Sequence, residues 1–279
     1  MVQSNIRGRW VVVGLVLCGV LAGCPEIAVV SAASPDLLLH ETRSAVLPRH
    51  AAIGRSPAAR PFVPVAAKVP RKIVALGDSI TRGVRSGVQP NETFAAVVQE
   101  ELRREGKEVE VVNAGMGGER TDGALARLDR DVLALRPDWV LLMYGTNDSY
   151  VDAGKADSRL SRGDFAANLR QLVTRLRRAD VRPILMTEPC WGLAARPNGV
   201  GEHPNGRLAG YMAACREVAR EMEVPLIDHF ARWSARQSAG MDVGDWTTDQ
   251  CHPNPAGHRI LADEILPEVR RQWRLLEAP

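Results

Sequence analysis

Short apolar runs alternate with amphipathic segments along the chain from about residue 71 onward. Five of the runs are bounded by polar or turn-forming residues, which is typical of buried strands. They cover residues 73–76, 109–112, 139–143, 184–186 and 225–227. Because the segments between them are long enough for helices, the pattern indicates a parallel sheet covered on both faces.

The segments between the runs repeat apolar side chains every three or four residues, as helices with one buried face do. The last helix has a clear start, because Asn254 suits the N-cap and Pro255 the first helical position. The sequence therefore predicts a three-layer α/β/α domain of the flavodoxin-like type, with five parallel strands. The apolar stripes are Phe94, Val97, Val98 and Leu102; Phe165, Leu169, Leu172, Val173 and Leu176; Leu208, Tyr211, Met212, Cys215, Val218 and Met222; and Ile260, Leu261, Ile265 and Val269.

The first residues have the pattern of an export signal. Two arginines precede an apolar stretch over residues 10–22, which is too short for a comfortable membrane span. The tetrapeptide LAGC that ends at Cys24 resembles the bacterial lipobox, in which the cysteine is lipidated. We therefore expect residues 1–24 to be a signal peptide with a lipobox, and the product to be a membrane-anchored lipoprotein, periplasmic or on the cell surface. The alternative is cleavage near residues 31–33, which would release a secreted protein.

Residues 25–70 differ in composition from residues 71–279. They are rich in proline and alanine and show no sustained helical or strand period. Such a segment is expected to be a semi-extended tether. The predicted organisation is thus a signal peptide, a tether and one domain over residues 71–279.

Four short polar segments come after predicted strands or precede the last helix: residues 77–80, 113–118, 145–148 and 249–252. In open parallel sheets ligands bind outside the carboxyl ends of the strands. Together the segments supply a serine, two groups of hydrogen-bond donors and an Asp-x-x-His pair, in that order. A serine hydrolase needs a nucleophile, a base, a carboxylate that orients the base and donors for the oxyanion.

These segments resemble the blocks of the SGNH or GDSL family of serine esterases and acylhydrolases, with GDSI in place of GDSL. The resemblance implies that Ser79 is the nucleophile and that Asp249 and His252 complete the triad. It also implies that Ser79, Gly118 and Asn147 donate to the oxyanion. The reaction would pass through an acyl-serine and would need no cofactor and no metal.

The loops expected around Ser79 are polar, which favours a short acyl ester, acetyl on a carbohydrate. Trp191, with Tyr150, could stack on a sugar ring, or Trp191 could simply pack its own loop. Alternatives of the same fold are a lysophospholipase, a thioesterase or an O-acyltransferase. The non-enzymatic alternative is a degenerate glycan-binding protein.

The composition is that of a globular domain, with 45% hydrophobic and 25% charged residues and a formal net charge of +3. A charge this small argues against a nucleic-acid partner. The expected partners are a small-molecule or glycan ester and, through Cys24, a membrane; the oligomeric state is left open.

Several polar residues near the predicted strand ends have structural explanations. Asp148 and Asp228 are expected to fix loops, and His258 to pack in the last helix. Glu202 and His203 lack the partner spacing of a metal site. Cys190 and Cys251 are predicted at the same end of the sheet, where an oxidising compartment would permit a disulfide.

Overall fold

The computed structural model describes residues 69–277. The predicted signal peptide, the lipobox cysteine Cys24 and nearly all of the predicted tether lie outside the described residues. No helix within the described range is long and apolar enough to cross a membrane.

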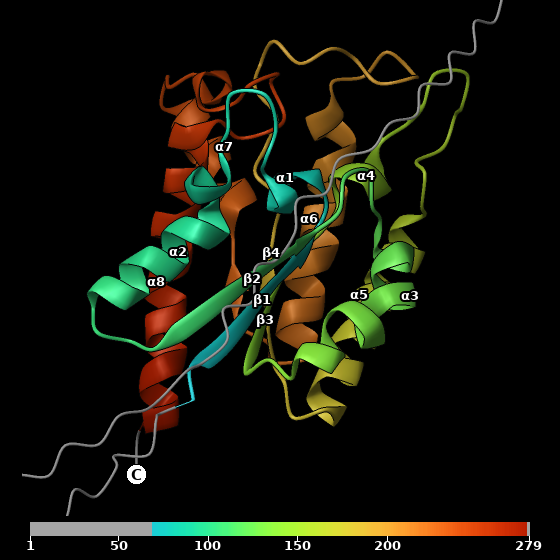
Figure 1. Cartoon of the computed structure of the whole chain (residues 1–279). Helices are drawn as coiled ribbons and strands as arrows, with labels where there is room; N and C mark the ends of the chain where they lie inside the picture. The colour runs from blue at the N-terminus through green and yellow to red at the C-terminus, as the bar shows by residue number, and fades with distance from the viewer. Residues whose placement is uncertain (1–68, 278–279) are drawn as a thin grey trace, which may run out of the picture. The chain divides into compact units, whose positions relative to one another are not determined.

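Five parallel strands form one sheet in the order β2-β1-β3-β4-β5. Figure 1 labels β1 to β4 of this sheet. The order reverses beside β1, as in doubly wound α/β domains, so the predicted fold class is confirmed. The strands are β1 (Arg71–Gly77), β2 (Val109–Gly115), β3 (Trp139–Met143), β4 (Arg182–Met186) and β5 (Leu226–Ile227).

Some strands begin or end at other residues than predicted, because the backbone pairing between strands does not stop where the apolar run stops. β2 continues past its apolar run because Asn113 and Gly115 still pair with Ala75 and Gly77 of β1. β5 is shorter than predicted, since Pro225 has no N–H to donate and contributes only its carbonyl, which accepts from Leu185 over 2.9 Å.

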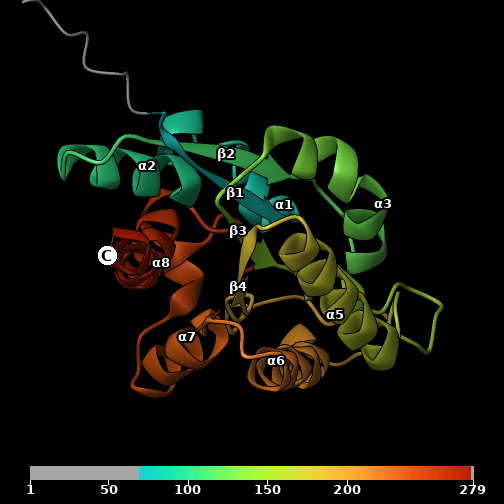
Figure 2. The same ribbon diagram turned by 90° about the horizontal axis from the view of Figure 1, so that it is seen from below.

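Helices cover both faces of the sheet (Figure 2). One face carries α2 (Phe94–Arg104), α7 (His229–Ser238) and α8 (Pro255–Glu277). The other carries α3 (Thr121–Asp131), α5 (Arg162–Arg178) and α6 (Pro204–Glu221). The shorter helical turns are α1 (Ser79–Arg82), α4 (Thr146–Ser149), η1 (Pro90–Glu92), η2 (Leu133–Leu135) and η3 (Val243–Trp246).

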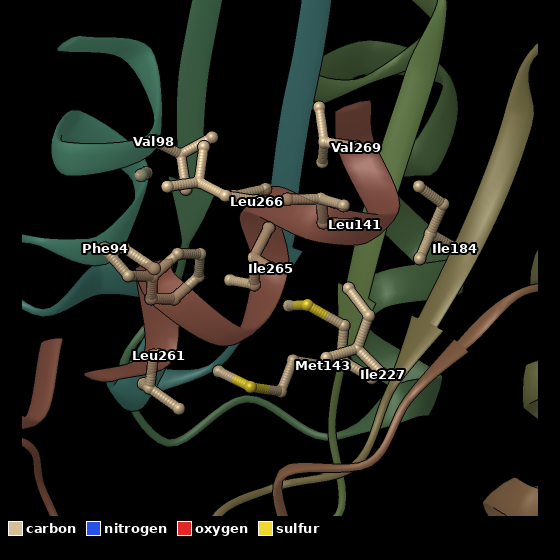
Figure 3. Close-up of a cluster of buried hydrophobic side chains, with 14 of the residues drawn as sticks. Phe94, Val98, Leu141, Met143, Ile184, Ile227, Leu261, Ile265, Leu266 and Val269 are labelled. Carbon is tan, nitrogen blue, oxygen red and sulfur yellow. The ribbon is translucent and has the colours of Figure 1, made fainter. Parts of the chain in front are cut away.

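The sheet separates two hydrophobic clusters because successive strand residues point to opposite faces. Leu141 and Met143 of β3 face α2 and α8, where Phe94 and Ile265 pack beside them (Figure 3). Burial of each such side chain contributes about 1.5–3 kcal/mol to folding. The predicted apolar stripes are the buried faces of these helices, which leaves the loops at the strand ends to carry chemistry.

The three cysteines of the described range, Cys190, Cys215 and Cys251, are free. Cys190 and Cys251 do belong to one buried cluster, as their predicted location implied, but the disulfide is not formed. Burial raises the pKa of both thiols. A raised pKa suppresses the thiolate that disulfide formation requires.

Candidate active site

The four polar segments meet at the carboxyl edge of the sheet. Ser79 begins α1 directly after β1, Gly118 comes after β2, and Asn147 lies in α4 after β3. His252 comes from the loop before α8. All four border one open cavity of about 440 Å3. The cavity is lined by Ser79, Arg82, Val84, Arg85, Gly117, Gly118, Asn147, Arg159 and His252.

A chain of hydrogen bonds joins Ser79, His252 and Asp249. Ser79 Oγ lies 2.9 Å from His252 Nε2, and His252 Nδ1 lies 2.9 Å from Asp249 Oδ2. The backbone N–H of His252 also donates to Asp249 Oδ1 over 2.9 Å. This arrangement can move a proton from the serine hydroxyl to the imidazole while the carboxylate holds the ring.

Arg85 is an addition that sequence reasoning missed. Its guanidinium donates to Asp249 Oδ2 over 2.8 Å, so the carboxylate that faces His252 is held from a second side. Arg85 lies on the loop after α1, where no periodic pattern or motif marks it.

The protonation states suit proton transfer near neutral pH. Burial lowers the pKa of His252 below its usual value, although the hydrogen bond to Asp249 offsets part of this effect. Burial alone would raise the pKa of Asp249, but hydrogen bonds from the backbone and ring of His252 bring it below the usual range. The imidazole is therefore neutral and the carboxylate ionised at pH 7.

A tight turn presents Ser79 to the cavity. Asp78 caps α1 by accepting from the N–H of Ile80 over 2.8 Å. Gly77 lets the turn close, because a methyl group there would lie 2.1 Å from Thr81 Oγ1 and 2.6 Å from the carbonyl of Met143. Gly77 and Asp78 of the GDSI segment thus hold Ser79 at the first position of a short helix.

Two backbone N–H groups at this cavity are free to bind an anion. No acceptor within residues 69–277 is bonded to the N–H of Ser79 or of Gly118. Gly118 has a φ of +76°, a conformation that glycine adopts without strain. Both N–H groups belong to residues that line the cavity beside Asn147.

The side-chain amide of Asn147 is held at both ends. Its Nδ2 donates to Asp78 Oδ2 over 2.8 Å, and its Oδ1 accepts from Arg159 over 3.0 Å. One of the two Nδ2 hydrogens is used by Asp78, which leaves the other for a ligand in the cavity. Sequence reasoning placed Asn147 but did not pair it with Asp78 or with Arg159.

Two fully buried carboxyl groups, Asp78 and Glu188, lie beneath this amide. Burial raises the pKa of Asp78 to about 7 and that of Glu188 well above its usual value. Neither side-chain oxygen of Glu188 has a hydrogen-bond partner within the described residues. Burial and the negative charge of the neighbouring Asp78 carboxyl therefore favour the neutral form of Glu188.

Tyr150 and Trp191 come together but do not line the cavity. Their rings stack with centroids 6.1 Å apart, and the Arg159 guanidinium lies 4.9 Å from the Tyr150 ring. Asn205 binds both the N–H and the carbonyl of Trp191, which fixes its backbone. Tyr150 therefore packs against the guanidinium that binds Asn147, and Trp191 packs against Tyr150.

The other polar residues singled out have structural partners. Asp148 Oδ1 accepts from the N–H and hydroxyl of Thr121, and Asp228 caps α7. His258 is buried and accepts from the N–H of Phe94 over 3.3 Å. The loop-fixing and packing predictions for these three residues are confirmed.

Glu202 and His203 are likewise held by neighbouring groups. His203 caps α6 and Glu202 pairs with Arg207. Residues 69–277 contain no group of three or more side chains arranged to hold a metal ion.

The sequence profile of the GDSL-like Lipase/Acylhydrolase family matches residues 75–260. The chain belongs to this family. It is a carboxylic ester hydrolase, as its sequence predicted.

Individual relatives agree with this assignment. The chain is 28% identical over 217 residues to the uncharacterized lipoprotein YqeF of Bacillus subtilis, covering 69% of this chain and 87% of that protein. It is 27% identical over 220 residues to an acetylxylan esterase of Geobacillus stearothermophilus, covering 72% and 95%. Its fold matches a lipase/acylhydrolase structure from Enterococcus faecalis with a TM-score of 0.59 and 28% identity, covering 72% and 96%.

Proposed function

We propose that this chain hydrolyses short acyl esters, foremost acetyl esters of carbohydrates, with Ser79 as the nucleophile. The observation that carries the proposal is the hydrogen-bonded chain from Ser79 through His252 to Asp249 at the edge of the cavity. It supplies the three groups that acyl transfer to a serine requires.

In the proposed reaction Ser79 Oγ attacks the ester carbonyl carbon while His252 Nε2 takes the hydroxyl proton. The N–H groups of Ser79 and Gly118 and the Asn147 amide bind the resulting oxyanion. The tetrahedral intermediate then expels the alcohol, which receives the proton from His252, and leaves an acyl-Ser79. Water that loses its proton to His252 attacks this ester, and collapse of the second intermediate returns the proton to Ser79 and releases the acid.

The lining of the cavity supports a small acyl group. A long acyl chain needs a largely apolar slot. Among the residues around Ser79 the lining includes one aliphatic side chain, that of Val84; the others are glycine or polar. One relative, matched over 95% of its own length, is an acetylxylan esterase, which supports acetyl on a sugar as the bond to be cleaved.

A second hollow favours a longer acyl chain as the competing function. It measures about 330 Å3, shares Arg82 and Val84 with the first cavity and extends to Pro90, Ala96 and Val111. An acyl chain that passed Val84 could continue there, as a lysophospholipase or thioesterase would need.

Hydrolysis rates across a p-nitrophenyl ester series, from acetate to palmitate, decide between the two. We expect kcat/KM to be highest for acetate or propionate, and acetylated xylooligosaccharides to be deacetylated. A maximum at long chains would reject the acetyl esterase and favour the second hollow as the acyl site. Ser79→Ala measured on the same series controls for contaminating esterases.

We also propose that the chain is exported and anchored through a lipid on Cys24. The LAGC tetrapeptide after the apolar run supports this, as does the likeness to a lipoprotein of Bacillus subtilis. Mass spectrometry of the protein from its native host should find a lipidated N-terminal Cys24. An unmodified terminus further along the chain would reject the anchor and favour a secreted enzyme.

A further inference from the structure

Three arginines line the cavity that holds Ser79: Arg82, Arg85 and Arg159. Two of them have carboxylate partners. Arg85 binds Asp249, and Arg159 forms two hydrogen bonds to Asp152, 2.7 and 2.9 Å long. The positive charges of Arg85 and Arg159 are therefore neutralised by carboxylates of the protein. Arg85 also holds Asp249 in place, and Arg159 holds Asn147.

Arg82 is different. Its side chain is exposed at the end of α1, three residues after Ser79, and no carboxylate within residues 69–277 forms an ion pair with it. Its guanidinium lies along the backbone of Gly117, since a methyl group placed there would be 3.1 Å from Nη1 and 3.3 Å from Cζ. An unpaired guanidinium thus lies next to Gly118, at the proposed oxyanion site.

The Arg82 guanidinium is also close to the proposed base, His252. Its positive charge adds, with that of Arg85, to the lowering of the pKa of His252. The unpaired guanidinium of Arg82 is therefore close both to Gly118 at the proposed oxyanion site and to the base His252. The alcohol portion of a bound ester must lie near these groups.

We propose that Arg82 binds a negatively charged group on the alcohol portion of the substrate, a carboxylate or a phosphate. The inference rests on the proposed function, because an acetyl group has no charge and the anion must then be on the alcohol. A guanidinium presents paired N–H donors that match the oxygens of both anions. The substrate class is thus an acetylated acidic sugar or an acetylated phosphate ester rather than a neutral glycan.

The test compares matched charged and neutral acetyl esters with the purified protein. One pair is an acetylated methyl glucuronoside with the corresponding glucoside, and the other is acetylglycerol phosphate with acetylglycerol. We expect the ratio of kcat/KM, charged over neutral, to be about ten in at least one pair, the size typical of one partly exposed charged hydrogen bond. The pair that shows the preference identifies the anion as carboxylate or phosphate.

Two variants assign the preference to Arg82. Arg82→Gln should bring the ratio to about one, and Arg82→Lys should restore part of it. Arg178→Gln is the matched control, because Arg178 is also exposed but ends α5 at the opposite edge of the sheet. The wild-type ratio should also shrink as salt is added, since exposed charges are screened.

The outcomes separate the two proposals. Hydrolysis of the neutral acetyl esters with a wild-type ratio of about one in both pairs would overturn the role of Arg82 and leave the esterase standing. A preference that survives in Arg82→Gln would also overturn it. Failure to cleave any acetyl ester would reject the proposed function and this inference with it.

Discussion

The side-chain amide of Asn147 donates a hydrogen bond to the buried carboxyl of Asp78 over 2.8 Å. At its other end the amide oxygen accepts from Arg159. An inverted amide would place its oxygen against a carboxylate and its NH2 group against a guanidinium. The two partners therefore fix which end of Asn147 faces the ester, before any substrate is bound.

Asn147→Ala should lower kcat by roughly a hundred- to a thousandfold with a smaller change in KM. The reason is that a donor to the oxyanion acts mainly in the transition state. Steady-state kinetics on p-nitrophenyl acetate gives both constants. A change confined to KM would show that Asn147 binds the substrate without stabilising the oxyanion.

Asp78→Asn should also lower kcat, because an amide holds the Asn147 NH2 group less firmly than a carboxylate does. If Asp78 acts through Asn147, the two substitutions should not add: Asp78→Asn in an Asn147→Ala background should cost little more than Asn147→Ala alone. Additive losses in this double-mutant cycle would mean that Asp78 instead acts on Ser79, whose helix it caps.

Ser79→Ala should abolish turnover without lowering the melting temperature by more than a degree or two. The substitution removes the nucleophile but no buried apolar contact, and alanine is well tolerated in a helix. Ester hydrolysis and thermal unfolding, measured on the same preparation, test both parts. Residual hydrolysis at near wild-type rates would refute Ser79 as the nucleophile.

The value of kcat/KM should fall at acidic pH with a midpoint below about 6.5, the usual pKa of histidine. The base must be neutral to accept the Ser79 proton, and burial lowers the pKa of His252, so the neutral form persists to lower pH. Arg85→Gln should move the midpoint upward, because removing a nearby positive charge favours the imidazolium. A wild-type midpoint at or above pH 7 would contradict this assignment.

Much of the fold was predictable because burial leaves a simple pattern in sequence. β3 lies where its apolar run predicts, and α8 begins at Pro255 after the Asn254 cap, whose Oδ1 accepts from the N–H of Gly257 over 3.0 Å. The motif residues could be placed for the same reason, since each comes after a strand or precedes a helix whose position was clear.

The groups that hold those motif residues left no such pattern. Arg85 and Arg159 lie in irregular loops, and their partners Asp249 and Asn147 are known only once the chain is folded. Glu188 lies just after β4 and could be mistaken for an exposed loop residue, yet it is fully buried beside Asp78. Such contacts depend on loop geometry, which has no periodic sequence pattern.

His258 should make the folded protein sensitive to acid. It is fully buried, and burial lowers its pKa to about 4. In the unfolded chain His258 has a pKa near 6.5. Between pH 6.5 and 4 the unfolded state therefore binds more protons than the folded state does. The free energy of unfolding falls as the pH falls through this range, by up to about 1.4 kcal/mol per pH unit from this group. Above pH 6.5 the group contributes no pH dependence.

Denaturant unfolding at pH 7 and pH 5 measures this effect. The loss of stability between the two should be smaller in His258→Gln, which keeps an acceptor for the N–H of Phe94 but cannot be protonated in this range. Comparing the two proteins cancels the contribution of the carboxylates, which titrate in both. An equal loss in both proteins, or an NMR titration that gives His258 an ordinary pKa, would show that its ring is not shielded from protons in the fold.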